Sequence, residues 1–256
     1  RDLRNVVDGH RAFLDPDVLR CSRELRFLLA WLDYVRPVRR RGGRMCLPEI
    51  SAGPEGMRIR GGYDVAMAHG SSDPMVPNDL RLDGEERIVV VTGPNHDGKT
   101  TYARMVAQEH YLACLGLSVP GESARLPCCE GFLGYLGEEE SRSVRNGRLR
   151  DDLLQVRGIL EAASPRSVVV LNELFSSTTS GDARRLMRWL IGRLAGIGCL
   201  AVIVTFLDGL DGVPSADDGH GDARGHADGP SGVGRVVGMV AGLDSADPPH
   251  PTFLLA

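Results

Sequence analysis

The chain has 256 residues, of which 42% are hydrophobic and 25% charged, enough for one large α/β domain with a full core. Its net charge of −4 excludes a strongly basic module that binds nucleic acid through overall charge. No apolar run approaches the roughly 18 residues of a membrane span and no signal peptide is evident, so we expect a cytoplasmic protein that does not enter a membrane. The sequence begins with Arg rather than Met, and we expect its start to be missing or processed.

The first predicted element is an amphipathic helix over residues 16–36. Asp15 and Pro16 suit its first turn, and Pro37 and the glycines at 42–43 predict its end. We assign residues 1–43 to the C-terminal part of a helical region and residues 44–256 to a separate domain. The apolar positions of the helix fall mostly three or four apart: Val18, Cys21, Leu25, Leu28, Leu29, Leu32 and Val35.

The segments before residue 88 read as short strands, clearest at Met45–Ile50 and Met57–Arg60, and indicate an antiparallel β subdomain. From residue 88 onward, strands and helices alternate, which predicts a mostly parallel sheet covered by helices. Residues 208–233 are rich in Asp and Gly and predict a flexible loop. The alternating elements are strands at 88–92, 168–171 and 200–205, final edge strands at 236–240 and 252–255, and helices at 100–115, 151–163 and 182–195.

The predicted helix at 151–163 places Leu153, Val156, Ile159 and Leu160 on one apolar face.

The six cysteines form no C-x-x-C pair and match no zinc spacing, so we expect reduced thiols. Cys114 and Cys199 lie among apolar residues and are predicted to be small core residues. The vicinal pair Cys128-Cys129 leaves a redox or metal role open as the minor alternative. His220 and His226 lie among aspartates at irregular spacing, which favours a solvated loop over a metal site.

Residues 93–100 read Gly-Pro-Asn-His-Asp-Gly-Lys-Thr and fit the phosphate-loop pattern G-x-x-x-x-G-K-[ST], with a predicted strand before and a helix after. Lys99 is the only lysine among 30 basic residues and would reach the β- and γ-phosphates of a nucleotide. The Thr100 hydroxyl would ligate Mg²⁺. The alternative is a chance glycine-rich turn. The predicted nucleotide-binding residues are Gly93, Pro94, Asn95, Gly98, Lys99, Thr100 and Thr101.

A second polar group follows the predicted strand at 168–171. Asn172 stands where such sites usually carry an Asp that helps to hold Mg²⁺, and its amide oxygen can accept a hydrogen bond from a metal-bound water. Glu173 is placed to orient or deprotonate the attacking water and is our catalytic candidate. The alternative is that Glu173 only caps the next turn.

With these motifs in place, residues 92–101 resemble the T-G-P-N-x-x-G-K-[ST]-[ST] phosphate loop of the MutS-type DNA mismatch repair ATPases, a branch of the ABC-type ATPases. Residues 76–79 (Val-Pro-Asn-Asp) are similar to the segment before that loop, and residues 115–120 to the turn after its helix. The acid-bearing start of the helix at 151 is also similar. The resemblance covers roughly residues 44–207. It leaves Tyr63 either stacked on the nucleotide base or packed as a strand aromatic.

The resemblance implies an ABC-type P-loop NTPase fold that binds ATP and Mg²⁺, forms a homodimer around two nucleotides and engages DNA through regions largely outside this chain. Residues 175–179 then correspond to a loop across the dimer interface. Gly147-Arg148 falls at the family's signature loop but lacks its hydroxyls. Three further departures are Asn172, Asp97 in the phosphate loop, and Phe206 in place of a histidine sensor, and they indicate a divergent subgroup with slow or altered hydrolysis.

The sequence is compatible with three functions. The first is the ATPase domain of a MutS-like repair protein, in which ATP-driven dimer closure is coupled to binding of mismatched or damaged DNA. The second is a nucleotide-dependent interaction module with little or no hydrolysis. The third, a small-molecule phosphotransferase, needs an acceptor lid, and the loop at 208–233 offers only Arg224. The basic residues at 36–44 either touch DNA phosphates or form a solvated helix end. We expect the acidic run at 138–140 to be a solvated face, with a regulatory contact as the minor alternative.

Overall fold

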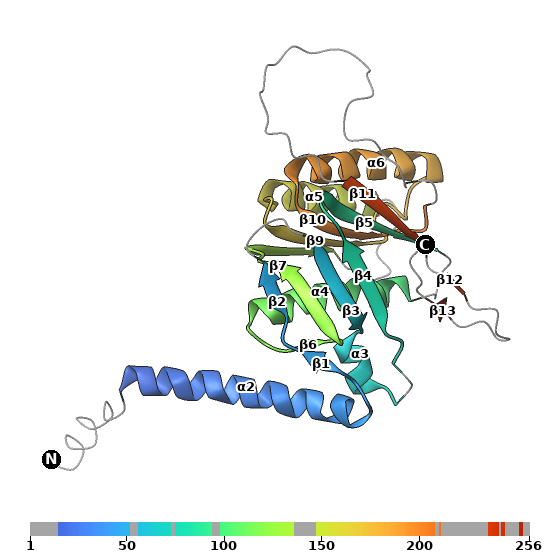
Figure 1. Cartoon of the computed structure of the whole chain (residues 1–256). Helices are drawn as coiled ribbons and strands as arrows, with labels where there is room; N and C mark the ends of the chain where they lie inside the picture. Colours follow the sequence, from blue (N-terminus) through green and yellow to red (C-terminus); the bar gives the residue numbers. More distant parts are fainter. Residues whose placement is uncertain are drawn as a thin grey trace.

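The centre of the molecule is a five-stranded sheet in the order β11-β5-β10-β9-β8 (Figure 1). Every neighbouring pair in it is parallel, which confirms the predicted α/β class. The computed structural model describes residues 15–51, 56–72, 75–93, 98–135, 147–207, 210, 235–240, 242–243 and 251–252. The five strands are β5 (Glu86–Thr92), β8 (Gly131–Tyr135), β9 (Ser167–Asn172), β10 (Leu200–Val204) and β11 (Arg235–Val240).

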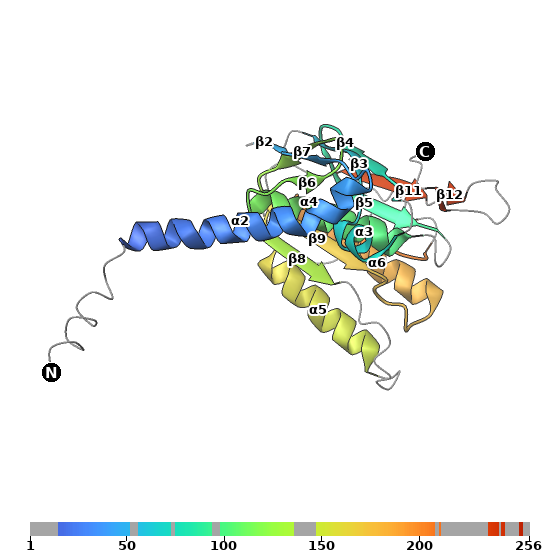
Figure 2. The ribbon, with the colours of Figure 1, turned by 90° about the horizontal axis from the view of Figure 1, so that it is seen from below.

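Helices cover both faces of this sheet, as a parallel sheet requires (Figures 1 and 2). Alternate strand residues divide between two cores. Ile88, Val90 and their equivalents pack against α5 (Arg148–Ala162) and α6 (Ser180–Ile197). Val89, Val91 and their equivalents pack against α4 (Lys99–Cys114). The central strands β9 and β10 are buried at every position: β10 is apolar throughout, and β9 is apolar between Ser167 and Asn172.

A four-stranded sheet in the order β2-β7-β3-β4 shares the core cluster of α4. Its strand β3 is antiparallel to both neighbours, while β2 and β7 are parallel, so the predicted antiparallel subdomain is a mixed sheet. Helix α4 therefore has apolar partners in two sheets. The strands are β2 (Glu49–Ser51), β3 (Met57–Gly62), β4 (Asn78–Leu82) and β7 (Ser123–Pro127); the smaller elements are β1 (Met45–Cys46), β6 (Val119–Pro120), β12 (Gly242–Leu243), β13 (Pro251–Thr252) and α3 (Val65–Gly70).

Helix α2 (Pro16–Arg40) projects away from this body (Figures 1 and 2). Its start is as predicted, since the Asp15 carboxylate accepts from the Asp17 N–H at 2.7 Å. Its predicted end was wrong, because the helix continues through Pro37 to Arg40. Proline removes one N–H donor and so leaves one helix bond unmade. Burial of Val35 and Val38 on either side of Pro37 fixes the last turns in place.

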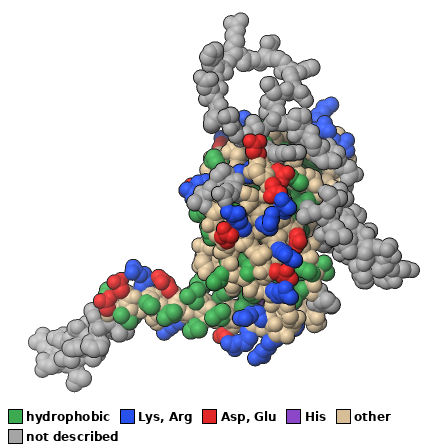
Figure 3. Space-filling model, in the orientation of Figure 1, with side chains coloured by type: hydrophobic (Ala, Val, Ile, Leu, Met, Phe, Trp, Pro, Cys, Tyr) green, Lys and Arg blue, Asp and Glu red, His purple; other side chains and the backbone are tan. Residues whose placement is uncertain are grey.

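The apolar face predicted for this helix is real, but most of it is exposed. Val35 and Val38 are its buried residues. Green side chains line the projecting part in Figure 3. The exposed apolar residues are Val18, Leu19, Leu25, Phe27, Leu28, Leu29, Leu32 and Tyr34.

Other predicted elements need correction. The strand expected at Met45–Ile50 is two strands, β1 and β2, separated at Leu47-Pro48, where proline cannot donate to a ladder. In α5 the buried side chains are Asp152, Val156 and Ile159, and Leu153 is exposed. The strand expected at 252–255 appears as β13, and residues 253–256 lie outside the described part. So does the predicted loop at 208–233, apart from the buried Leu210.

Of the two cysteines predicted to lie in the core, one is buried and the other is exposed. Cys199 is fully buried, as predicted. Cys114 is exposed, because it is the last residue of α4 and ends beyond the apolar contacts of that helix.

Two titratable side chains of α4 lie inside the molecule. Glu109 is fully buried, and its carboxylate oxygens have no hydrogen-bond partner among the described residues. Burial raises its pKa to about 9, so the acid is neutral at pH 7. His110 donates from Nδ1 to the Val106 carbonyl at 2.9 Å, and burial lowers its pKa to about 4. Both groups are therefore uncharged in the folded chain at neutral pH.

The buried Glu109 predicts a pH-dependent cost to folding. Its folded pKa lies above the unfolded value of 4.5. Below pH 4.5 the group is protonated in both the folded and the unfolded chain, so it does not lower the free energy of unfolding there. As pH rises from about 4.5 to about 9, the free energy of unfolding falls because only the unfolded chain ionises this group. Glu109→Gln removes this loss. We expect the variant to gain about 1 kcal/mol relative to the unmodified chain per pH unit between pH 5 and 8, measured by urea unfolding.

The matched control is Glu85→Gln, which changes an exposed glutamate. Its stability curve should run parallel to that of the unmodified chain. A Glu109→Gln curve that also runs parallel would contradict the neutral buried acid.

Candidate functional site

Three strands end side by side at one edge of the parallel sheet. Val204 of β10 lies opposite Asn172 of β9 and opposite Val91 of β5. The chain leaves these strands at Gly93, Glu173 and Thr205. The carboxyl edge of a parallel sheet is where ligands of such folds bind. The two predicted site segments, which lie far apart in sequence, are therefore brought together here.

Lys99 is held at the start of α4. Its side chain is only 3% exposed, and its Nζ donates to the Gly93 carbonyl at 2.8 Å. The residue before it, Gly98, caps the helix in a left-handed conformation (φ 85°) and has no side chain to occupy the first N–H groups. The lysine ammonium and the positive end of the helix dipole thus lie together at the N-terminus of α4. The predicted loop residues Pro94 and Asn95, and Asp97, lie outside the described part.

The first turn of α4 also contacts the end of β9. The Thr100 hydroxyl donates to Asn172 Oδ1 at 3.2 Å, and Asn172 is buried. These are the two residues that the sequence singled out for Mg²⁺, and the structure brings their oxygens together. Thr101 faces elsewhere, with its hydroxyl 3.9 Å from the Met67 sulfur of α3.

The turn after β9 has an unusual backbone. Glu173 has φ 53° and Phe175 has φ 62°, and among the described residues they are the only non-glycine positions with positive φ. Such conformations cost of order 1–3 kcal/mol and persist where surrounding structure imposes them. The Glu173 N–H donates to the Val204 carbonyl at 2.9 Å. The next helix, α6, is capped by Thr179 rather than by Glu173.

The side chain of Asp152 in α5 binds the backbone of this turn. It is 1% exposed and accepts from the Tyr135 hydroxyl at 2.8 Å and from the Phe175 N–H at 3.0 Å. The sequence pointed to an acid in this helix without assigning its contacts. The sequence does indicate that this acid is buried, because Asp152 lies on the same helical face as Val156 and Ile159. A carboxylate at that position predicts a buried polar anchor.

Other predicted residues take different places. Tyr63 is 5% exposed, and its hydroxyl donates to the Arg44 carbonyl at 2.9 Å, so it is a packed aromatic rather than a base-stacking one. Thr205 is buried, and its N–H donates to the Val91 carbonyl, whereas the following Phe206 is 38% exposed. Gly147 caps the start of α5.

The part of the chain that the structure describes holds no helix long and apolar enough to cross a membrane. It also holds no group of three or more His, Cys, Asp or Glu side chains arranged for a metal ion.

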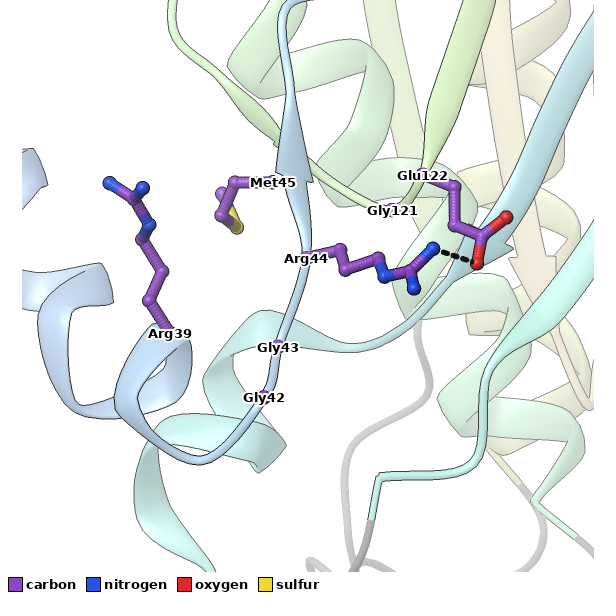
Figure 4. A pocket seen from close by; sticks show the side chains of 7 residues that line it. All are labelled: Arg39, Gly42, Gly43, Arg44, Met45, Gly121 and Glu122. Carbon is purple, nitrogen blue, oxygen red and sulfur yellow. Dashed lines mark hydrogen bonds and ion pairs between the residues drawn. The ribbon is translucent and has the colours of Figure 1, made fainter.

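A cavity of about 400 Å³ lies where α2 joins β1, away from the residues predicted for the nucleotide site (Figure 4). Its lining includes Arg39 and Arg44, but Arg44 pairs with Glu122 at 2.5 Å, which offsets the positive charge. None of the predicted site residues lines it. Its lining residues are Arg39, Gly42, Gly43, Arg44, Met45, Gly121 and Glu122.

This chain is similar in sequence to proteins of one known family. The family model for MutS domain V matches residues 89–215. The DNA mismatch repair protein MutS of Nitratidesulfovibrio vulgaris is 30% identical over 186 residues, which is 73% of this chain and 20% of that protein. The chain contains a MutS-family domain. The match to domain V covers the end of β5 and all of α4, β9 and β10, and so includes Gly93, Lys99, Asn172 and Glu173.

Two further relatives of this MutS domain show the same partial coverage. The DNA mismatch repair protein MutS 1 of Halobacterium salinarum is 32% identical over 68% of this chain and 19% of that protein. The DNA mismatch repair protein msh3 of Botryotinia fuckeliana is 30% identical over 66% of this chain and 15% of that protein. The chain thus spans a fifth or less of the length of these three relatives.

Because Asp152 anchors the turn after β9, replacing it should destabilise the MutS domain more than replacing the neighbouring Asp151. Asp152→Ala leaves the Tyr135 hydroxyl and the Phe175 N–H without their acceptor and should lower the free energy of unfolding by about 2–3 kcal/mol. Asp151→Ala changes an exposed first-turn residue and should cost less than about 1 kcal/mol. Urea unfolding of both variants measures the difference. Equal losses would show that Asp152 does not anchor the turn.

Proposed function

We propose that this MutS domain binds ATP with Mg²⁺ at the carboxyl edge of the parallel sheet and acts as a nucleotide-driven switch. One observation carries the proposal. The only lysine of the chain is buried at the N-terminus of α4, and its neighbour Thr100 contacts Asn172 at the end of β9. A chance glycine-rich turn gives no reason for a lysine to be buried there.

The residues present fit both groups. The N–H groups at the start of α4 and the Lys99 ammonium would hold the phosphates, with Gly93 and Gly98 allowing close backbone approach. Thr100 and Asn172 supply oxygens, the ligand type that Mg²⁺ prefers. Bound Mg²⁺ would neutralise phosphate charge. Glu173 follows directly after Asn172 and would orient or accept a proton from the attacking water. Pro94, Asn95 and Thr101 complete the proposed binding set.

The wider assignment rests on the family and on α2. We propose an ABC-type P-loop NTPase domain over residues 44–256, and residues 1–43 as the end of a helical region. The exposed apolar residues of α2 support this, because such a helix has more apolar surface than the described part of the chain covers. Two copies would close around two nucleotides. The relatives are named DNA mismatch repair proteins, and contact with mismatched or damaged DNA would involve regions beyond this chain.

Two substitutions separate binding from hydrolysis. Lys99→Ala should weaken ATP binding by at least about tenfold, because it removes a charge-assisted contact worth about 1.5–3 kcal/mol. Glu173→Gln should retain binding and lower single-turnover hydrolysis by at least about a hundredfold, the usual contribution of a positioned general base. Equilibrium binding and single-turnover assays with Mg²⁺ measure the two effects.

Arg104→Ala is the matched control, since Arg104 is an exposed cation on the same helix. It should leave both binding and hydrolysis unchanged. Equal ATP binding by Lys99→Ala and the unmodified chain would reject the phosphate-loop assignment.

A second candidate function is a nucleotide-dependent interaction module with little or no hydrolysis. Asn172 favours it, because the site lacks the carboxylate that would strengthen the hold on Mg²⁺. In this case ATP binding alone would control partner contact, and turnover would be negligible in the unmodified chain.

The charge at position 172 tests this alternative. Asn172→Asp restores one negative charge beside Thr100 and should strengthen Mg²⁺-dependent ATP binding about tenfold. Binding measured without Mg²⁺ should not strengthen, and this provides the internal control. If the unmodified chain binds ATP without turnover and Asn172→Asp gains turnover, the interaction module is the native function. Hydrolysis by the unmodified chain favours the ATPase switch.

A further inference from the structure

Two thiols that are distant in sequence meet at the end of α4. Cys114 is the last residue of that helix, and Cys129 lies in the connection between β7 and β8. Their sulfur atoms are 2.9 Å apart, and the two positions are separated by 15 residues. Both are free thiols, with Cys114 exposed and Cys129 half-buried. No disulfide framework or catalytic motif in the sequence accounts for this approach.

The two thiols differ in their environment. Burial raises the pKa of Cys129 to about 12, and the hydrogen bond with Cys114 adds to the shift. Cys129 therefore keeps its proton at neutral pH. Cys114 is the exposed member, so a small dissolved oxidant reaches it first.

We propose that Cys114 and Cys129 are an oxidation site that forms a reversible disulfide on exposure to hydrogen peroxide. In the first step the Cys114 thiolate attacks one peroxide oxygen, which yields a sulfenic acid at Cys114 and releases hydroxide. In the second step the Cys129 sulfur attacks the Cys114 sulfur, and the sulfenic oxygen leaves with the Cys129 proton as water. Two thiols are oxidised, and one peroxide is reduced to two waters.

Cys128 is the competing partner, and the structure disfavours it. Adjacent residues have Cα atoms only about 3.8 Å apart, below the roughly 4.4–6.8 Å usual for a disulfide. A vicinal Cys128–Cys129 bond is therefore strained. Cys128 is exposed, but the sulfur that Cys114 contacts is that of Cys129.

The bond would join elements that lead to the proposed nucleotide site. Helix α4 begins at Lys99 and ends at Cys114. The segment with Cys129 leads into β8, which pairs with β9 and so with the strand that ends at Asn172. Oxidation itself depends only on the two thiols and proceeds whether or not the chain binds ATP.

Peptide mapping of the full chain tests the proposal. The reduced protein is treated with a few equivalents of hydrogen peroxide, free thiols are alkylated, and trypsin digestion is followed by mass spectrometry without reduction. Cleavage at arginine places Cys114 in peptide 105–125 and both Cys128 and Cys129 in peptide 126–142. We expect these two peptides joined, lighter than their sum by two hydrogen atoms, and separated again by dithiothreitol.

Three variants assign the bond. Cys128→Ser should retain the cross-link, Cys129→Ser should lose it, and Cys199→Ser, at a buried cysteine distant in sequence, should behave as the unmodified chain. Fragmentation of the joined peptides from the unmodified chain distinguishes Cys128 from Cys129 without any variant. A cross-link through Cys128, a bond within peptide 126–142, or over-oxidation of Cys114 with no cross-link would each overturn the proposal.

Discussion

The arrangement of the proposed site depends on one packing constraint, the burial of β10 on both faces between β5 and β9. All five β10 residues are buried, and their register fixes where the neighbouring strands end. Because β10 hydrogen-bonds to a strand on either side, its two registers together fix where the ends of β5 and β9 lie relative to each other. The apolar core thus sets the distance between Lys99, which follows β5, and Asn172, which ends β9. The site is thus positioned by apolar strand residues, of which Val204 also accepts the Glu173 N–H through its carbonyl.

The charge distribution of the site follows from the same geometry. A buried ammonium is costly unless it is hydrogen-bonded, and Lys99 bonds to the carbonyl of Gly93. The polar group that ends β9 is a neutral amide, so no carboxylate at position 172 offsets the positive charge of Lys99 and the start of α4. That balance suits an anionic phosphate more than a bare divalent cation. The strained Glu173–Phe175 turn is kept in place by Asp152, whose carboxylate is fully engaged with Tyr135 and Phe175.

Much of the central sheet could be predicted, because buried parallel strands need uninterrupted apolar runs, and those at 88–92, 168–171 and 200–205 occur within a residue or two of their places. In the mixed sheet, the segments predicted at 45–50 and 57–60 overlap β2 and β3, whereas β4 and β7 were not predicted. Strands such as β4 and β7 alternate arginine with apolar residues over only five positions, and their partners are distant in sequence. The phosphate-loop spacing pointed to Lys99 and Thr100, and the end of the apolar run at 168–171 pointed to Asn172. Neither pattern could give the contacts of Asp152 or the exposure of Cys114, which depend on where helices end relative to the sheets.

The solitary lysine has a practical consequence. Among the 30 lysine and arginine residues of this sequence Lys99 is the one lysine, so it carries the only ε-amino group. Amine-selective reagents, acetylation and ubiquitin attachment therefore have one side-chain target, and it is 3% exposed at the N-terminus of α4. Acylation there would remove the ammonium charge and require the first turn of the helix to open. Chemical labelling of the Lys99 side chain thus reports on the opening of this single turn.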